Sequence, residues 1–137
     1  MKIHTTNYTN TFIQVAEDSP AKAGELPPVK SDKPTVANLQ FDRLIKHPYQ
    51  YTSDDIVFHV FAEKNSIPKA EQKGARVAFF SKGQPCLRAS PLTKRYGWGV
   101  HCDEEGKIAL YACDSEEYKR YVEDKSLMQM KAMRSKR

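Results

Sequence analysis

The feature that most constrains the fold is a β-hairpin that the sequence predicts between residues 96 and 113. Residues 96–102 alternate large and small side chains, and residues 107–113 form a second, mostly apolar run. The tetrapeptide Asp-Glu-Glu-Gly separates the two runs, and its last residue, Gly106, readily adopts the positive φ that a tight hairpin turn requires. The chain must therefore contain a β-sheet that includes this hairpin.

The turn also predicts which residues of the two strands face each other. With residues 104–106 as a three-residue loop, four pairs follow: Asp103 with Lys107, Cys102 with Ile108, Trp98 with Ala112, and Gly97 with Cys113. Cys102 and Cys113 do not meet in this register, which argues against a disulfide across the hairpin. The chain has three cysteines, none at the spacing of a zinc or redox motif, so we expect free, buried thiols.

The remaining segments predict a mixture of helices and strands. We expect strands at 10–16 and 126–133, a long loop at 17–33, and helices at 34–46, 53–64 and 68–81, with a further short helix that opens at Ser115. The segment 56–62 is ambiguous, because its β-branched residues also suit a strand. A helix is the preferred interpretation, since Ser53 would cap it and two acidic residues would follow in its first turn.

These elements predict a single α+β domain over residues 1–137. Its sheet, mixed or antiparallel, would contain the 96–113 hairpin and have helices packed on one face. The basic segment 130–137 would form a mobile tail. No apolar run approaches the ~20 residues of a membrane span, and the N-terminus lacks a signal-peptide stretch, so we expect a cytoplasmic protein that does not enter a membrane.

Charge is distributed unevenly along the chain. The formal net charge is +5, and the last seven residues alone carry four cations. The rest of the chain is therefore close to neutral, so the charge total does not by itself indicate a nucleic-acid-binding face, which needs clustered cations. The basic terminus is a second place where nucleic acid or an acidic partner would bind, and solubility explains it equally well.

Short runs along nearly the whole chain give it a family resemblance. It resembles a small family of bacterial and fungal proteins known only as a domain of unknown function, which implies no activity and no catalytic residue. The runs are Thr5-Thr6-Asn7-Tyr8, Val15-Ala16-Glu17-Asp18, Tyr51-Thr52-Ser53-Asp54-Asp55, Lys82-Gly83-Gln84, Cys86-Leu87-Arg88, Ser90-Pro91-Leu92, Lys94-Arg95-Tyr96-Gly97-Trp98-Gly99, Glu105-Gly106-Lys107 and Lys131-Ala132-Met133-Arg134-Ser135-Lys136-Arg137.

The densest group of polar side chains lies between residues 88 and 101. Cations, hydroxyls and an imidazole gather there beside a lone tryptophan, a combination that suits an anionic ligand such as a nucleotide, another phosphate compound or nucleic acid. Gly97 and Gly99 would let a ligand or another backbone approach Trp98 closely. The predicted ligand-binding residues are Arg88, Ser90, Lys94, Arg95, Trp98 and His101.

Other interpretations of this segment remain open. Trp98 is equally suited to anchor the core, with the cations merely solvated. An enzyme would use His101 as acid or base with help from Ser90, although His101 and Cys102 cannot pair because strand neighbours point to opposite faces. A protein-interaction domain or a homo-oligomer is a third reading. The motifs G-x-S-x-G, H-E-x-x-H and G-x-x-x-x-G-K-[ST] are absent from the sequence, and the histidines have no metal-ligand spacing. We therefore predict neither a metal nor a cofactor.

Overall fold

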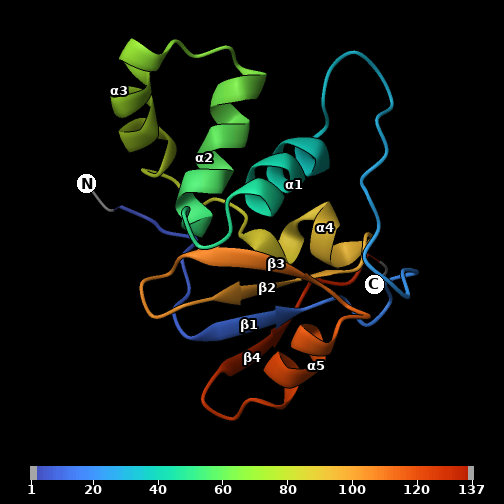
Figure 1. Ribbon diagram of the computed structural model, residues 1–137. Coiled ribbons are helices and arrows are strands. Elements are labelled where there is room, and N and C mark those ends of the chain that lie inside the picture. Colours follow the sequence, from blue (N-terminus) through green and yellow to red (C-terminus); the bar gives the residue numbers. More distant parts are fainter. Residues whose placement is uncertain (1–2, 136–137) are drawn as a thin grey trace.

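A four-stranded sheet lies at the centre of the computed structural model, which describes residues 3–135 (Figure 1). The strand order is β3-β2-β1-β4, with β1 antiparallel to β2 and parallel to β4. The sheet is therefore mixed, and the fold belongs to the α+β class, as predicted. The strands are β1 (Thr11–Gln14), β2 (Trp98–Cys102), β3 (Ile108–Ala112) and β4 (Met128–Lys131).

The hairpin has the register that its turn predicted. Trp98 faces Ala112 and Cys102 faces Ile108. Gly106 has a φ of +80°, and its N–H donates to the carbonyl of Asp103, which closes the three-residue loop. The local turn chemistry is thus sufficient to fix this pairing.

Within residues 3–135, five α-helices and one 3-10 turn accompany the sheet. The segment 53–64 is a helix, as preferred, but its N-cap is Thr52 rather than Ser53. Ser53 is buried instead, with its hydroxyl 2.8 Å from that of Thr6. The elements are α1 (Val36–Lys46), α2 (Ser53–Lys64), α3 (Lys69–Phe79), the 3-10 turn η1 (Leu87–Ala89), α4 (Pro91–Lys94) and α5 (Glu116–Glu123).

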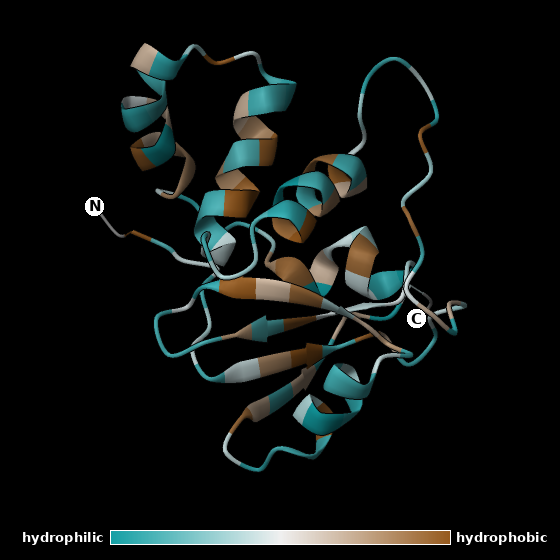
Figure 2. Cartoon of the chain, viewed as in Figure 1, coloured by the Kyte–Doolittle hydropathy of each residue, from teal (hydrophilic) through white to brown (hydrophobic). Residues whose placement is uncertain are grey.

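The main core lies between the sheet and the layer of α1 and α4. Ile13 and Val100 are almost fully buried there, against Phe41 and Leu44 of α1. Figure 1 shows α1, α2, α3 and α4 on this side of the sheet. Figure 2 shows brown, apolar residues along the strands and teal, polar residues over much of the helices' outer surface. Helices packed on one face of the sheet were expected, and these four are arranged in that way.

The short helix α5 packs on the opposite face, which the sequence did not predict. Phe12 alternates with Ile13 along β1, so one of the two must point away from the main core. Phe12 is fully buried under α5, with its ring 5.0 Å from that of Tyr118 and 5.4 Å from that of Tyr121. Gly99 makes room for them, since a Cβ there would lie 2.6 Å from the Tyr118 ring.

A smaller apolar cluster joins α2 to α3. It contains Phe58, Ala62 and Phe80, flanked by Phe61 and Phe79. None of the residues of α3 is itself buried. The pair α2–α3 therefore extends from the main core, to which α2 is anchored mainly through its first turns.

The C-terminal segment that was predicted to be a mobile tail is attached to the sheet over residues 130–135. Its first two residues end strand β4. Lys131 and Arg134 both pair with Glu17, and these hydrogen bonds lower the pKa of Glu17 to about 2. The backbone N–H of Ser135 donates to Asp18. Residues 136 and 137 of the predicted tail lie outside the described residues.

No helix within residues 3–135 combines the length and the apolar composition that a membrane crossing requires. The three cysteines are free thiols, as predicted; Cys102 is buried, while Cys86 and Cys113 are half-buried.

Candidate functional site

The structure does not bring the six predicted ligand-binding residues together. Trp98 and His101 are three positions apart on β2, so their side chains lie on opposite faces of the sheet. Trp98 packs on Phe41 of α1, whereas His101 stacks on Tyr121 of α5. Cys102 points into the main core, where burial raises the pKa of its thiol to about 12, so it forms no nucleophilic pair with His101.

Two of the other predicted residues, Arg88 and Ser90, connect elements of the scaffold. The Nε of Arg88 donates to the carbonyl of Lys131 at 2.7 Å, which ties η1 to β4. Ser90 caps α4 and donates to the side-chain oxygen of Gln40 on α1. Lys94 ends α4 and is half-buried.

Arg95 is the predicted residue that lines a charged cavity, which we call the basic pocket. This cavity of about 480 Å³ contains the side chains of four cationic residues, and none of the described residues that line it is acidic. The pocket is lined by Pro28, Lys30, Lys33, Pro34, Thr35, Val36, Ala37, Lys64, Pro91, Arg95 and Tyr96.

The N-terminus of α1 opens into the basic pocket. Thr35 is the N-cap, and Val36 and Ala37 are the first helical residues. The first turn of α1 contains no acidic residue, although carboxylates are favoured at the positive end of a helix dipole. Lys64 is held nearby, because its Nζ donates to the carbonyl of Pro34 at 3.3 Å. The positive end of the α1 dipole and the four cationic residues therefore line the same cavity.

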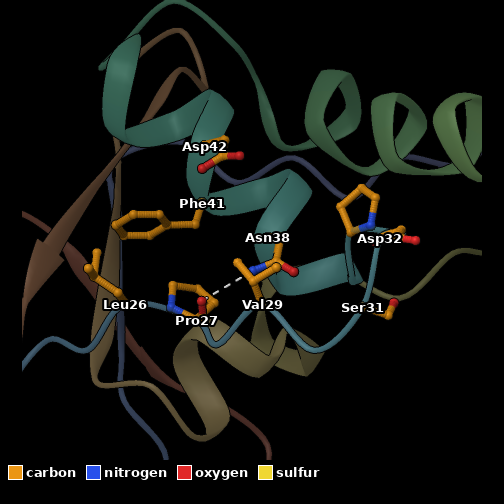
Figure 3. Close-up of a pocket in the computed structure, with 9 residues that line it drawn as sticks. Leu26, Pro27, Val29, Ser31, Asp32, Asn38, Phe41 and Asp42 are labelled. Atoms are coloured by element: carbon orange, nitrogen blue, oxygen red, sulfur yellow. Dashed lines mark hydrogen bonds between the residues drawn. The ribbon is translucent and has the colours of Figure 1, made fainter.

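The loop that carries Lys30 and Lys33 is fixed against α1. Asn38 of α1 donates to the carbonyl of Pro27 at 3.2 Å, the bond drawn in Figure 3. The same stretch of loop borders a separate cavity of about 310 Å³ on its other side, where Asp32 and Asp42 lie. Asp32 thus lines the separate cavity, while Lys30 and Lys33 line the basic pocket.

The start of the same loop is held by the hairpin. The indole N–H of Trp98 donates to the carbonyl of Glu25 at 2.8 Å. Gly97 has a φ of +81°, and a Cβ there would lie 2.2 Å from the carbonyl oxygen of Ala23. We predicted that a ligand or another backbone would approach closely at Gly97. The backbone that does so is that of Ala23.

A third cavity, which we call the apolar groove, adjoins the basic pocket. It has a volume of about 420 Å³ and shares Val36 and Pro91 with the basic pocket. Most of its lining is aliphatic or aromatic. The groove is lined by Val36, Gln40, Val57, Val60, Phe61, Phe79, Gln84, Pro85, Cys86, Ala89, Ser90 and Pro91.

His101 belongs to a hydrogen-bonded group of tyrosines on the α5 face. Its Nδ1 lies 2.7 Å from the hydroxyl of Tyr49, which also lies 2.8 Å from that of Tyr111 and 3.3 Å from that of Tyr121. Burial lowers the pKa of His101 and, together with these bonds, raises that of Tyr49. Within residues 3–135, no three His, Cys, Asp or Glu side chains converge as metal ligands.

Sequence reasoning missed three of the four cations of the basic pocket: Lys30, Lys33 and Lys64. The local sequence could have indicated Lys30 and Lys33. The segment Lys30-Ser31-Asp32-Lys33-Pro34-Thr35 places lysines directly before a helix whose first turn contains no acid. Cations at that end of a helix are electrostatically unfavourable unless an anion joins them. Lys64 comes close only through the packing of α2 on α1, which the sequence alone does not reveal.

The fold and the pocket define a small α+β protein with a basic cavity at a helix N-terminus. Residues 3–137 match the model of a family described as a family of unknown function (DUF6157), and the chain belongs to that family. The family resemblance predicted from the sequence is thereby confirmed. No curated protein and no solved structure matches the chain.

Proposed function

We propose that the protein is a cytoplasmic binding protein for a small phosphate-bearing molecule, which it holds in the basic pocket. The observation that carries the proposal is the convergence of four cations on one cavity whose described lining contains no acid. Its free thiols are typical of a reducing compartment, which supports the cytoplasmic location.

A phosphate group suits the chemistry of the basic pocket. Arg95 offers a planar guanidinium that can bind two phosphate oxygens at once, and the lysines add mobile point charges. The N–H of Asn38 already donates to Thr35 in the capping box, so the N–H groups of Val36 and Ala37 are the further donors that the first turn of α1 offers an anion. A bound phosphate would also relieve the repulsion among these like charges.

Titration with inorganic pyrophosphate tests the proposal. Trp98 is the only tryptophan, and its indole is bonded to the loop that carries Lys30 and Lys33, so its fluorescence should report binding. Calorimetry provides an independent signal. We expect saturable binding that weakens as salt increases, because exposed charges are screened.

Charge-reversal variants locate the site. Arg95→Glu and Lys64→Glu should each weaken pyrophosphate binding about tenfold or more, since a hydrogen bond to a charged group contributes about 1.5–3 kcal/mol. Lys73→Glu on α3, outside the basic pocket, is the matched control and should bind like the wild type. Equal weakening by all three variants, or no saturable binding by the wild type, would refute the proposal.

A further inference from the structure

The apolar groove carries an unused hydrogen-bonding group deep among apolar side chains. Gln40 is only 5% exposed, and its side-chain oxygen accepts the bond from Ser90. Its Nε2 has no hydrogen-bond partner within residues 3–135, yet it is not fully covered by protein. Gln40 is one of the residues that line the groove.

The walls of the groove are suited to a flat ring. Phe61 and Phe79 both line it, with ring centroids 4.5 Å apart and ring planes inclined by 34°. Val36, Val57 and Val60 complete the apolar surface. Aromatic side chains bind heterocyclic rings through their faces and edges with little regard to which base is present.

The groove and the basic pocket are neighbours. They share Val36 and Pro91, and each has the volume of a typical small-molecule site. A ligand that filled both would need an anionic end and an apolar, planar end. The two ends must also be linked closely enough to pass Val36 and Pro91.

We propose that the ligand is a mononucleotide, with its phosphate in the basic pocket and its base in the apolar groove, hydrogen-bonded to the amide of Gln40. This inference rests on the proposed phosphate-binding function. An alkyl chain is a poorer occupant, because it would remove the Gln40 amide from water and offer it no partner. A nucleobase supplies ring nitrogens or carbonyl oxygens that accept this hydrogen bond.

The test compares three kinds of phosphate monoester, which differ only in what is attached to the phosphate. Calorimetry is run with the four ribonucleoside 5′-monophosphates, with ribose 5-phosphate and with octyl phosphate. We expect at least one nucleotide to bind about tenfold or more tightly than ribose 5-phosphate, which lacks the base. Octyl phosphate should gain no such advantage.

Variants of the groove separate the base from the phosphate. Gln40→Leu should remove the advantage of the nucleotide and leave the affinity for ribose 5-phosphate unchanged. Ala89→Leu, which fills the groove from η1 without touching Gln40, should do the same and guards against a folding defect in the first variant. Gln50→Leu replaces an exposed glutamine outside the groove and should leave all affinities unchanged.

Two results would overturn the nucleotide inference while the proposed function stands. One is that no nucleotide binds more tightly than ribose 5-phosphate. The other is that octyl phosphate binds more tightly than every nucleotide, which would make the groove a site for an alkyl chain. Failure of all these monoesters and of pyrophosphate to bind would instead refute the phosphate-binding function itself.

Discussion

At the scale of single residues, His101 belongs to a hydrogen-bonded group centred on the hydroxyl of Tyr49. A phenol has one hydrogen to donate and two lone pairs to accept with. If Tyr49 donates to Nδ1 of His101, it can accept from Tyr111 and from Tyr121, and every group has a partner. A protonated His101 would donate to Tyr49, which could then donate to one of the two tyrosines and accept from the other. Burial of the ring lowers the pKa of His101 and so favours the neutral imidazole.

Burial of the His101 ring predicts a loss of stability in mild acid. Burial lowers the folded-state pKa of His101 below its usual 6.5, and that of His59 likewise. The unfolded chain then binds more protons as the pH falls below about 6.5, so the free energy of unfolding must decrease. Urea denaturation at pH 7.5 and 5.5 measures the difference, and His101→Gln, which cannot titrate, should reduce it.

The acid window of the histidines is distinct from that of Glu17. The folded-state pKa of Glu17 is lowered to about 2 from 4.5, so its contribution is lost only below about pH 4.5. A pH dependence between 7.5 and 5.5 that is the same in wild type and His101→Gln would contradict the role assigned to His101.

At the scale of elements, the loop 17–33 is held in place by glycine at one position of the hairpin. Gly97→Ala should lower the free energy of unfolding by at least about 1–2 kcal/mol, because alanine disfavours positive φ. The new Cβ would also displace the loop at Ala23 and expose Trp98. Urea denaturation and a red shift of tryptophan emission measure these two effects.

Gly74 offers the matched control for that substitution. It lies inside α3, and a Cβ there would meet nothing within 4 Å. Gly74→Ala should therefore raise the free energy of unfolding by about 0.5–1 kcal/mol without changing the emission of Trp98. If Gly97→Ala behaved like Gly74→Ala, the loop would not depend on the close approach at Gly97.

The elements also explain how much the sequence could predict. The hairpin register and the start of α2 depend on residues within a few positions of each other. The register was predicted, and the helix start was predicted with Ser53 as its cap in place of Thr52. The face that α5 covers, and the separation of Trp98 from His101 by the sheet, depend on how distant segments pack. Arg95 was predicted because it lies among other cations, whereas Lys64 reaches the same pocket only through the contact of α2 with α1.

At the scale of the whole molecule, the candidate binding region lies where two parts of unequal stability meet. One wall of the apolar groove comes from the main layer of α1, η1 and α4, and the other from α2 and α3. Ile56 of α2 belongs to the main core, but α3 contributes no buried residue. An ion pair of 2.9 Å between Arg76 and Asp55 is one of the contacts that hold α3 against α2.

This arrangement predicts a gradient of hydrogen exchange across the molecule. Segments with few buried apolar contacts open locally at lower free energy than the core. Amides of α3 should therefore exchange faster than those of β1 and β2, and Arg76→Ala should speed exchange in α3 without affecting the sheet. Equal protection of α3 and β2 would contradict this gradient.

Ligand binding should change the gradient in a way that depends on the ligand. A nucleotide that contacts Phe79 in the apolar groove should slow exchange in α3, because binding stabilises the closed form against local opening. Pyrophosphate occupies only the basic pocket, so it should slow exchange at the start of α1 and leave α3 unchanged. Hydrogen exchange measured with nucleotide and with pyrophosphate, each at saturation, distinguishes the two protection patterns. If pyrophosphate and nucleotide protected the same segments, the base would not lie against α3.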